Sequence, residues 1–247
     1  MPIRCIEPGW TPHPRVRACV TTREGGVSQG AYASLNLATH VGDRREDVEE
    51  NRRRLQRHLG LPHEPAWLEQ VHGIDVVRIE HAIPGAVPRA DASWTDRAGL
   101  ACAILTADCL PVLLADDEGT CVAAAHAGWR GLAAGVLENT VRHLPAAPDR
   151  LSAWLGPGIG PGAFEVGPDV FDAFVGPDPG AATAFVRGRD DRFLCDLHVL
   201  ARRRLAAAGV TRVDGDASQC TFADAGSYFS HRRDRSGGRM ATLVWLA

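Results

Sequence analysis

The chain contains no lysine, since all 27 of its basic residues are arginine. Lysine forms Schiff bases with carbonyl substrates and with pyridoxal phosphate, and it completes the phosphate-binding P-loop. The sequence therefore excludes these three kinds of site. With 30 acidic residues the formal net charge is -3 at pH 7, which argues against a general nucleic-acid-binding protein.

No stretch of the chain reaches the roughly 18 consecutive apolar residues of a membrane-spanning helix. Residues 1–8 also lack the apolar core of a signal peptide. We therefore expect a cytoplasmic protein without a membrane partner. The seven cysteines are scattered and include no Cys-x-x-Cys pair, so the sequence predicts neither a disulfide framework nor a zinc ribbon.

Local patterns predict a single domain, residues 1–247, of mixed secondary structure. Helices are expected over residues 44–59, 132–144 and 197–208. Strands are expected over residues 16–22, 67–72, 74–79, 101–105, 111–115, 120–125 and 241–246. Asp43 and Glu46 have capping-box spacing before the first helix, and Asp196 can cap the third. Because strands and helices follow no regular βαβ order, the predicted fold class is α+β, with a mixed β-sheet flanked by helices.

One predicted hairpin places a cysteine beside a histidine. Residues 116–119, with the sequence DDEG, form a turn cluster between two apolar runs. If these four residues close the hairpin, Ala115 faces Thr120, and Cys109 lies directly opposite His126. Their side chains would then share one face of the sheet, with Cβ atoms about 5 Å apart. A slip of one residue would place them on opposite faces.

These two residues and His72, which lies at an irregularity before Gly73, form a candidate metal site. Three protein ligands and one open position are typical of catalytic zinc, whereas four protein ligands are typical of structural zinc. A zinc ion would lower the pKa of a water in the open position to about 7. Asp108, next to Cys109, is a candidate for orienting a ligand or carrying a proton, and Glu165 is a similar candidate.

The spacing leaves two other interpretations open. Cys109 could be a nucleophile with His126 as its base, because the same contact across the strands would serve that chemistry. Alternatively, His72 and His126 could be ordinary, partly buried histidines that only make hydrogen bonds.

Several motifs make the chain resemble a known family. They are REGGVS at 23–28, SLNL at 34–37, EQVHG at 69–73, TADCLPV at 106–112, AHAGWRG at 125–131, FEVG at 164–167 and GRM at 238–240. In this order they resemble the bacterial YfiH family, also named the laccase-domain, polyphenol oxidase or peptidoglycan editing factor family. The motifs extend from near residue 20 to the C-terminus, so the resemblance covers almost the whole chain.

The resemblance implies a purine nucleoside phosphorylase with zinc on His72, Cys109 and His126. Such an enzyme cleaves adenosine or inosine with phosphate to release the base and ribose 1-phosphate. Adenosine deamination and phosphorolysis of S-methyl-5'-thioadenosine are related activities that it also implies. Phosphate needs positive charge around it, and Arg23, Arg130 and Arg233 in the matched motifs are the candidate substrate-binding residues.

The resemblance also implies a second activity, an amidase that removes L-Ser from the cell-wall precursor UDP-MurNAc-L-Ser. Apart from the resemblance, the candidate ligands leave open a non-catalytic metal-binding protein, which a fourth protein ligand near the metal would favour. The laccase name fits poorly, because multicopper oxidases need paired His-x-His ligands and the sequence has none, although copper could bind adventitiously at the three ligands. His231 stands where the family usually has tyrosine, and residues 234–237 stand where the family has a threonine before Gly238 and Arg239, which weakens any role assigned to this loop.

Overall fold

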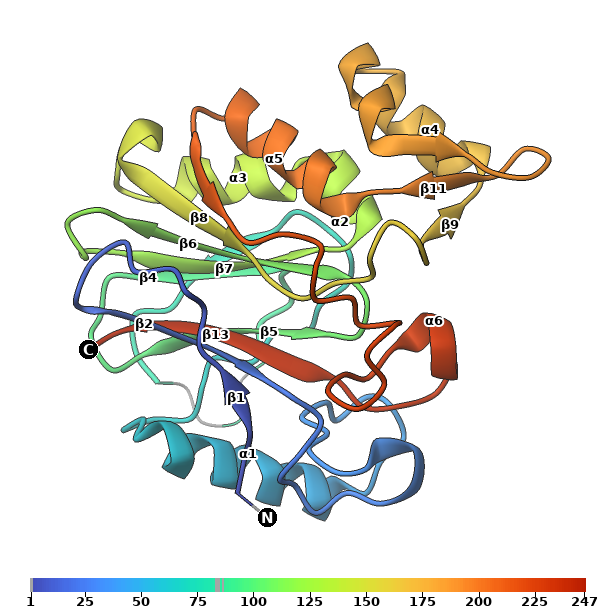
Figure 1. The fold of residues 1–247 in the computed structure, drawn as a ribbon. Helices are drawn as coiled ribbons and strands as arrows, with labels where there is room; N and C mark the ends of the chain where they lie inside the picture. The colour runs from blue at the N-terminus through green and yellow to red at the C-terminus, as the bar shows by residue number, and fades with distance from the viewer. Residues whose placement is uncertain (1, 83–84, 86) are drawn as a thin grey trace.

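Two β-sheets lie face to face at the centre of the molecule, and helices cover both outer faces (Figure 1). The computed structural model describes residues 2–82, 85 and 87–247. The six-stranded sheet has the order β12-β8-β6-β7-β4-β3. Its strands are β3 (Val76–Arg78), β4 (Ala92–Thr95), β6 (Leu110–Asp116), β7 (Val122–Ala127), β8 (Leu151–Leu155) and β12 (Arg212–Asp214).

A four-stranded sheet with the order β1-β2-β13-β5 packs against the six-stranded sheet. Its strands are β1 (Cys5–Ile6), β2 (Val16–Thr21), β5 (Ala101–Thr106) and β13 (Met240–Leu246). A third, small sheet consists of β9 (Glu165–Val166), β10 (Phe185–Arg187) and β11 (Phe193–Cys195). Most strand pairs are antiparallel, but β3–β4 and β8–β12 are parallel. The predicted α+β class with a mixed sheet is therefore confirmed.

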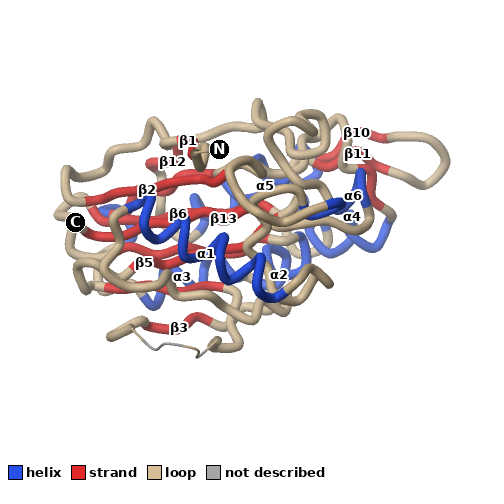
Figure 2. The backbone as a smooth tube through the Cα atoms, turned by 90° about the horizontal axis from the view of Figure 1, so that it is seen from below, coloured by secondary structure: helices blue, strands red, loops and turns tan. Residues whose placement is uncertain are grey.

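The helices are α1 (Arg45–Leu59), α2 (Trp129–Ala134), α3 (Val136–His143), α4 (Pro168–Val175), α5 (Leu197–Ala207) and α6 (His231–Asp234), and short 3-10 turns are Gly30–Tyr32, Pro148–Arg150 and Pro179–Ala184. Seen from below, α1 crosses the strands of the four-stranded sheet (Figure 2). Helices α2, α3 and α5 lie on the outer face of the six-stranded sheet (Figure 1). None of the helices in the described part of the chain is long and apolar enough to cross a bilayer.

This layering explains why the central strands are buried along their whole length and are mostly apolar. Every residue of β5, β6 and β7 is buried, because each of these strands has a packed layer on both faces. Ile104, Leu113 and Val122 lie in the core between the two sheets. Such continuous burial fixes the ends of β6 and β7, where Cys109 and His126 lie.

Two of the predicted helices are confirmed, and one prediction about capping is wrong. Helix α5 begins as expected at Asp196, whose side chain accepts hydrogen bonds from two backbone N–H groups of the first turn. Helix α1 has nearly its expected bounds, but Arg44 is its N-cap and no side chain caps it. Asp43 does not complete a capping box, because its carboxylate accepts hydrogen bonds from Ser28 and Asn36.

The expected helix after His126 is broken in two. Gly135 has a φ of 100°, a left-handed conformation that ends α2 and begins α3. The expected strand over residues 67–72 is also wrong, since this segment follows an irregular path and belongs to none of the sheets in the described chain. Of the following strand-like run, only the part from Val76 to Arg78 is in a sheet.

The predicted register of the hairpin is wrong by two residues. Ala115 pairs with Val122 instead of Thr120, and His126 pairs with Pro111. The turn is longer than four residues, because the Asp116 carboxylate accepts hydrogen bonds from the backbone N–H groups of both Thr120 and Cys121. A shift of two residues preserves the side-chain alternation of a strand.

Candidate metal centre

Three distant segments bring His72, Cys109 and His126 together. Cys109 immediately precedes β6, His126 is the penultimate residue of β7, and His72 lies in the loop before β3. Their donor atoms all lie within 4.8 Å of one another, and the Cys109 Sγ is 3.8 Å from the His72 Nε2. The two imidazole rings meet edge to face, with centroids 4.7 Å apart.

One side of this cluster is open to solvent. His126 is buried, with 3% of its surface exposed, whereas Cys109 is half-buried and His72 is exposed. A ligand can therefore approach from the side of His72, while the side of His126 belongs to the protein core. Within the described residues no fourth His, Cys, Asp or Glu side chain joins the group.

A buried carboxylate that the sequence did not reveal supports the cluster. Asp91 directly precedes β4, and its Oδ1 lies 2.8 Å from the Nδ1 of His126. The same oxygen accepts the backbone N–H of His72 at 2.9 Å, and Oδ2 accepts those of Gly73 at 2.6 Å and Val71 at 3.2 Å. Burial opposes ionisation, but these contacts outweigh it and hold the pKa of Asp91 below its usual value.

The carboxylate of the candidate residue Asp108 is bound by the C-terminal segment. Its carboxylate accepts hydrogen bonds from the Thr221 hydroxyl at 2.7 Å, from the Ser230 hydroxyl at 3.0 Å and from the backbone N–H of Arg232 at 2.6 Å. Asp108 also has a φ of 93°, which is rare outside glycine. The turn that presents Cys109 is therefore tied to the loop around α6.

The neighbours of Cys109 favour its thiolate form. Burial opposes ionisation, but the charges and hydrogen bonds of His126 and His72 are stronger and lower the pKa of the thiol to about 6. Although burial alone would lower the pKa of His126, the contacts with Cys109 and Asp91 raise it. A thiolate is the form of cysteine that binds metal ions.

Gly128 forms a wall of the cluster. A Cβ atom at this position would lie 2.8 Å from the Cδ2 of His72 and 3.0 Å from the Sγ of Cys109. The backbone angles of Gly128, φ -63° and ψ 152°, are ones that any residue adopts, so only space requires glycine here. The backbone at the start of α2 can therefore approach both side chains closely.

The residues present fit a zinc ion. Zinc bound tetrahedrally to sulfur at about 2.3 Å and to nitrogen at about 2.0–2.1 Å places these two donors about 3.6 Å apart. The observed separation between Cys109 and His72 is 3.8 Å. Because Asp91 lies against the Nδ1 of His126, the Nε2 is the nitrogen left for a metal ion. One thiolate and two imidazoles also suit copper, so the donor set indicates a metal without identifying it.

The three candidate arginines differ in what their guanidinium groups contact. Arg23 donates to the carbonyls of Ala33 and Ala225. Arg233 donates to several carbonyls of the loop before α6 and pairs with Asp234. Arg130 lies over the ring of Trp129 at 4.4 Å, and among the described residues its guanidinium has no hydrogen bond or ion pair.

Glu165 and Arg239 both make hydrogen bonds in the region of α6. Glu165 is exposed in β9, and its backbone carbonyl accepts a hydrogen bond from Arg232. Arg239, which the sequence did not single out, is half-buried and donates to the carbonyls of Gly237 and Gly238. Burial lowers the pKa of Arg239, while the negative charges of Cys109 and Asp108 oppose this shift.

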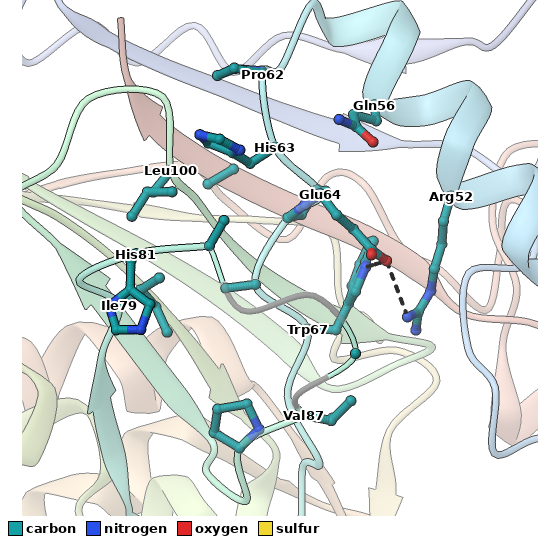
Figure 3. A pocket seen from close by; sticks show the side chains of 16 residues that line it. Arg52, Gln56, Pro62, His63, Glu64, Trp67, Ile79, His81, Val87 and Leu100 are labelled. Carbon is teal, nitrogen blue, oxygen red and sulfur yellow. Dashed lines mark hydrogen bonds and ion pairs between the residues drawn. The ribbon is translucent and has the colours of Figure 1, made fainter.

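A separate cavity of about 250 Å³ lies between α1 and the segments that precede and follow β3 (Figure 3). None of the three cluster residues lines it. Three of its polar side chains are paired with one another: Arg52 stacks on Trp67 at 4.3 Å, and the Trp67 Nε1 donates to the Glu64 carboxylate at 2.7 Å. Burial lowers the pKa of Arg52 to about 10. The cavity is therefore distinct from the candidate metal centre.

Comparisons with known proteins agree with the sequence motifs. The family model described as multi-copper polyphenol oxidoreductase laccase matches residues 17–247. The chain is 55% identical over 242 residues to the purine nucleoside phosphorylase PA4543 of Pseudomonas aeruginosa, with 98% of each chain covered. It is 51% identical over 243 residues to the purine nucleoside phosphorylase YfiH of Escherichia coli, covering 98% of this chain and 99% of that one.

Solved structures show the same fold. A Neisseria meningitidis protein, NMB0706, superposes with a TM-score of 0.94 at 52% identity and covers 98% of both chains. YlmD from Geobacillus stearothermophilus superposes with a TM-score of 0.91 at 34% identity, over 98% of this chain and 96% of that one. With motifs, family model, relatives and fold in agreement over nearly the whole length, the chain belongs to the YfiH family of laccase-like proteins.

Proposed function

We propose that the protein is a zinc-dependent purine nucleoside phosphorylase that acts on adenosine, inosine and S-methyl-5'-thioadenosine and also deaminates adenosine. The observation that carries this proposal is the cluster of His72, Cys109 and His126 with one side open to solvent. The names of the two relatives, both more than half identical to this chain, support the phosphorylase activity.

Cys109, His126 and His72 have different roles at this site. Cys109 contributes a negative charge, and His126 is held by Asp91 so that its Nε2 faces the cluster. His72 lies at the exposed edge, where a substrate enters. Zinc bound to these three side chains would act as a Lewis acid and would lower the pKa of a bound water, which is the chemistry that deamination of a purine requires.

Phosphorolysis adds a requirement for positive charge. The reaction forms a bond between a phosphate oxygen and the ribose C1' and breaks the bond from C1' to the base nitrogen, which takes up a proton. Arg130 is the best placed of the candidate arginines, because it lies two residues after Gly128, which touches the cluster, and its guanidinium stacks on Trp129 without a hydrogen bond or ion pair to the described residues.

Metal removal tests the proposal directly. We expect the purified protein to convert adenosine and phosphate into adenine and ribose 1-phosphate, with inosine as the product of deamination. Treatment with a chelator should abolish both products, and added zinc should restore them, as followed by chromatography. A chelated, metal-free protein of undiminished activity would refute the zinc dependence. Failure to form any purine product, together with serine release from UDP-MurNAc-L-Ser, would favour the amidase instead.

The arginine assignment makes a second prediction. Arg130→Ala should raise the KM for phosphate about tenfold, which equals the loss of about 1.4 kcal/mol of binding, and should leave thermal unfolding unchanged. Arg233→Ala should instead lower the free energy of unfolding by about 2 kcal/mol, because buried carbonyls lose a charged donor. Steady-state kinetics against phosphate and thermal unfolding of both variants separate these effects. An unchanged phosphate KM in the Arg130 variant would contradict the assignment.

A further inference from the structure

We infer that Asp91 is the positioning residue of the metal centre, with its single carboxylate fixing both histidines of the cluster. The inference rests on the proposed metal site and adds to it. Asp91 does not face the open side: it is fully buried behind the cluster and accepts hydrogen bonds from His126 and from the loop that carries His72.

The first effect of Asp91 is on the orientation of His126. A neutral imidazole has one N–H and one nitrogen with a free lone pair, and only the latter binds a metal ion. A carboxylate 2.8 Å from Nδ1 accepts a hydrogen bond from an N–H at that nitrogen, which leaves the lone pair on Nε2. The backbone N–H of His126 also donates to the Asp91 carbonyl at 2.7 Å, so both the ring and the backbone are held.

The second effect is on the backbone at His72. This residue has a φ of 60°, in the left-handed region that residues with a Cβ rarely adopt. Three successive backbone N–H groups, those of Val71, His72 and Gly73, all point at the Asp91 carboxylate. The carboxylate therefore compensates for an unfavourable backbone conformation, and that conformation places the His72 ring against Cys109.

The four hydrogen bonds require a carboxylate at this position. An ionised carboxylate has about four lone-pair sites, and Asp91 uses two on each oxygen. Asparagine keeps one oxygen and replaces the other by an amino group, which would face the N–H groups of Val71 and Gly73 or the Nδ1 of His126. Asp91→Asn therefore disturbs both histidines with almost no change in side-chain volume.

The chain offers a matched control in Asp116. This residue is also buried and also holds the backbone N–H groups of a loop, those of Thr120 and Cys121 in the β6–β7 turn. It lies at the opposite end of β6 from Cys109, about 20 Å away by the rise of a strand. Asp116→Asn thus removes the same kind of interaction without contact with the cluster.

The test compares zinc affinity and thermal unfolding in the two variants and the wild type. We expect both variants to unfold at a lower temperature in the metal-free state, as a structural role predicts. Zinc affinity, measured by competition with a chromophoric chelator, should fall about 10- to 100-fold in Asp91→Asn and stay within about twofold in Asp116→Asn. Cobalt substituted for zinc should show an altered absorption spectrum in Asp91→Asn alone, because the ligand geometry changes.

Each outcome decides a separate point. Wild-type zinc affinity in Asp91→Asn, or an equal loss in Asp116→Asn, would overturn the positioning role and leave the proposed function intact. A wild-type protein that takes up neither zinc nor cobalt would overturn the proposed function and this inference with it. If Asp91→Asn does not fold, Asp91→Glu takes its place. It keeps four acceptor sites but displaces them by one methylene, and a loss of zinc affinity of at least tenfold is again expected, with unchanged affinity overturning the role.

Discussion

Replacement of Cys109 by alanine is expected to abolish phosphorolysis of adenosine and to weaken zinc binding by more than about 100-fold. Loss of a residue that only hydrogen-bonds to a metal ligand already lowers metal affinity about 10- to 100-fold, and loss of a ligand itself costs more. The variant should fold normally. The side chain is half-buried, and among the described residues its polar contacts are with the two histidines, so truncation removes little packing. Product chromatography and the zinc content of the purified variant measure the two effects.

Cys220→Ala provides the matched control for this experiment. Cys220 is also half-buried, accepts a hydrogen bond from the backbone N–H of Gly160 at 3.1 Å and does not belong to the cluster. Its variant should retain zinc and activity. Full activity in Cys109→Ala would refute the assignment of the reaction to this cluster.

A second substitution at the same position separates a ligand from a nucleophile. The lowered pKa of Cys109 and its contact with His126 suit a metal ligand and a nucleophile equally well. Aspartate binds zinc but lacks the thiol, and Cys109→Asp should therefore keep zinc and a measurable fraction of the activity if Cys109 is a ligand. A zinc-loaded but inactive Cys109→Asp protein would instead favour the nucleophile.

The sequence predicted the members of the cluster better than the geometry that joins them. The expected pairing of Cys109 with His126 was wrong in register, because Asp116 binds the backbone of the turn and lengthens it by two residues. An even shift preserved the side of the sheet on which the residues lie, so the two side chains still meet. An odd shift would have separated them.

The elements predicted most reliably were those with local signals. Helix α5 follows from the cap at Asp196 and the spacing of its apolar residues. By contrast, no local pattern indicates that β13 lies between β2 and β5, or that two sheets pack face to face. Strand order depends on contacts between residues far apart in the chain, which a single sequence does not display.

Asp91 shows the same limitation at the site itself. The residue lies between Ala90 and Ala92, with Arg89 and Ser93 beyond them, so nothing in the local sequence marks it as a buried carboxylate. Its partners are backbone N–H groups about twenty residues earlier and a histidine 35 residues later. Backbone donors have no sequence signature, and the left-handed conformation of His72, a residue that is not glycine, also cannot be read from residue type.

The close approach of Gly128 leads to the prediction that Gly128→Ala disables the site without unfolding the protein. The new methyl group would lie 2.8 Å from the His72 ring and 3.0 Å from the Cys109 sulfur, closer than side chains normally pack. The backbone of Gly128 accepts alanine without strain, and at such positions alanine usually stabilises a protein by about 0.4–1 kcal/mol through the unfolded chain. The two side chains must therefore move apart to make room.

A displacement of catalytic groups by about 1 Å can reduce a rate about 100-fold, and we expect kcat of the Gly128 variant to fall by that order. Zinc affinity should fall with it, while the unfolding temperature should stay at or slightly above that of the wild type. Gly162→Ala is the control, since a Cβ at that position meets no atom within 4 Å. Kinetics, chelator competition and thermal unfolding of the two variants measure these effects. Lower stability with wild-type zinc affinity in Gly128→Ala would mean that α2 moves and the ligands do not, which would contradict the prediction that this substitution disables the site.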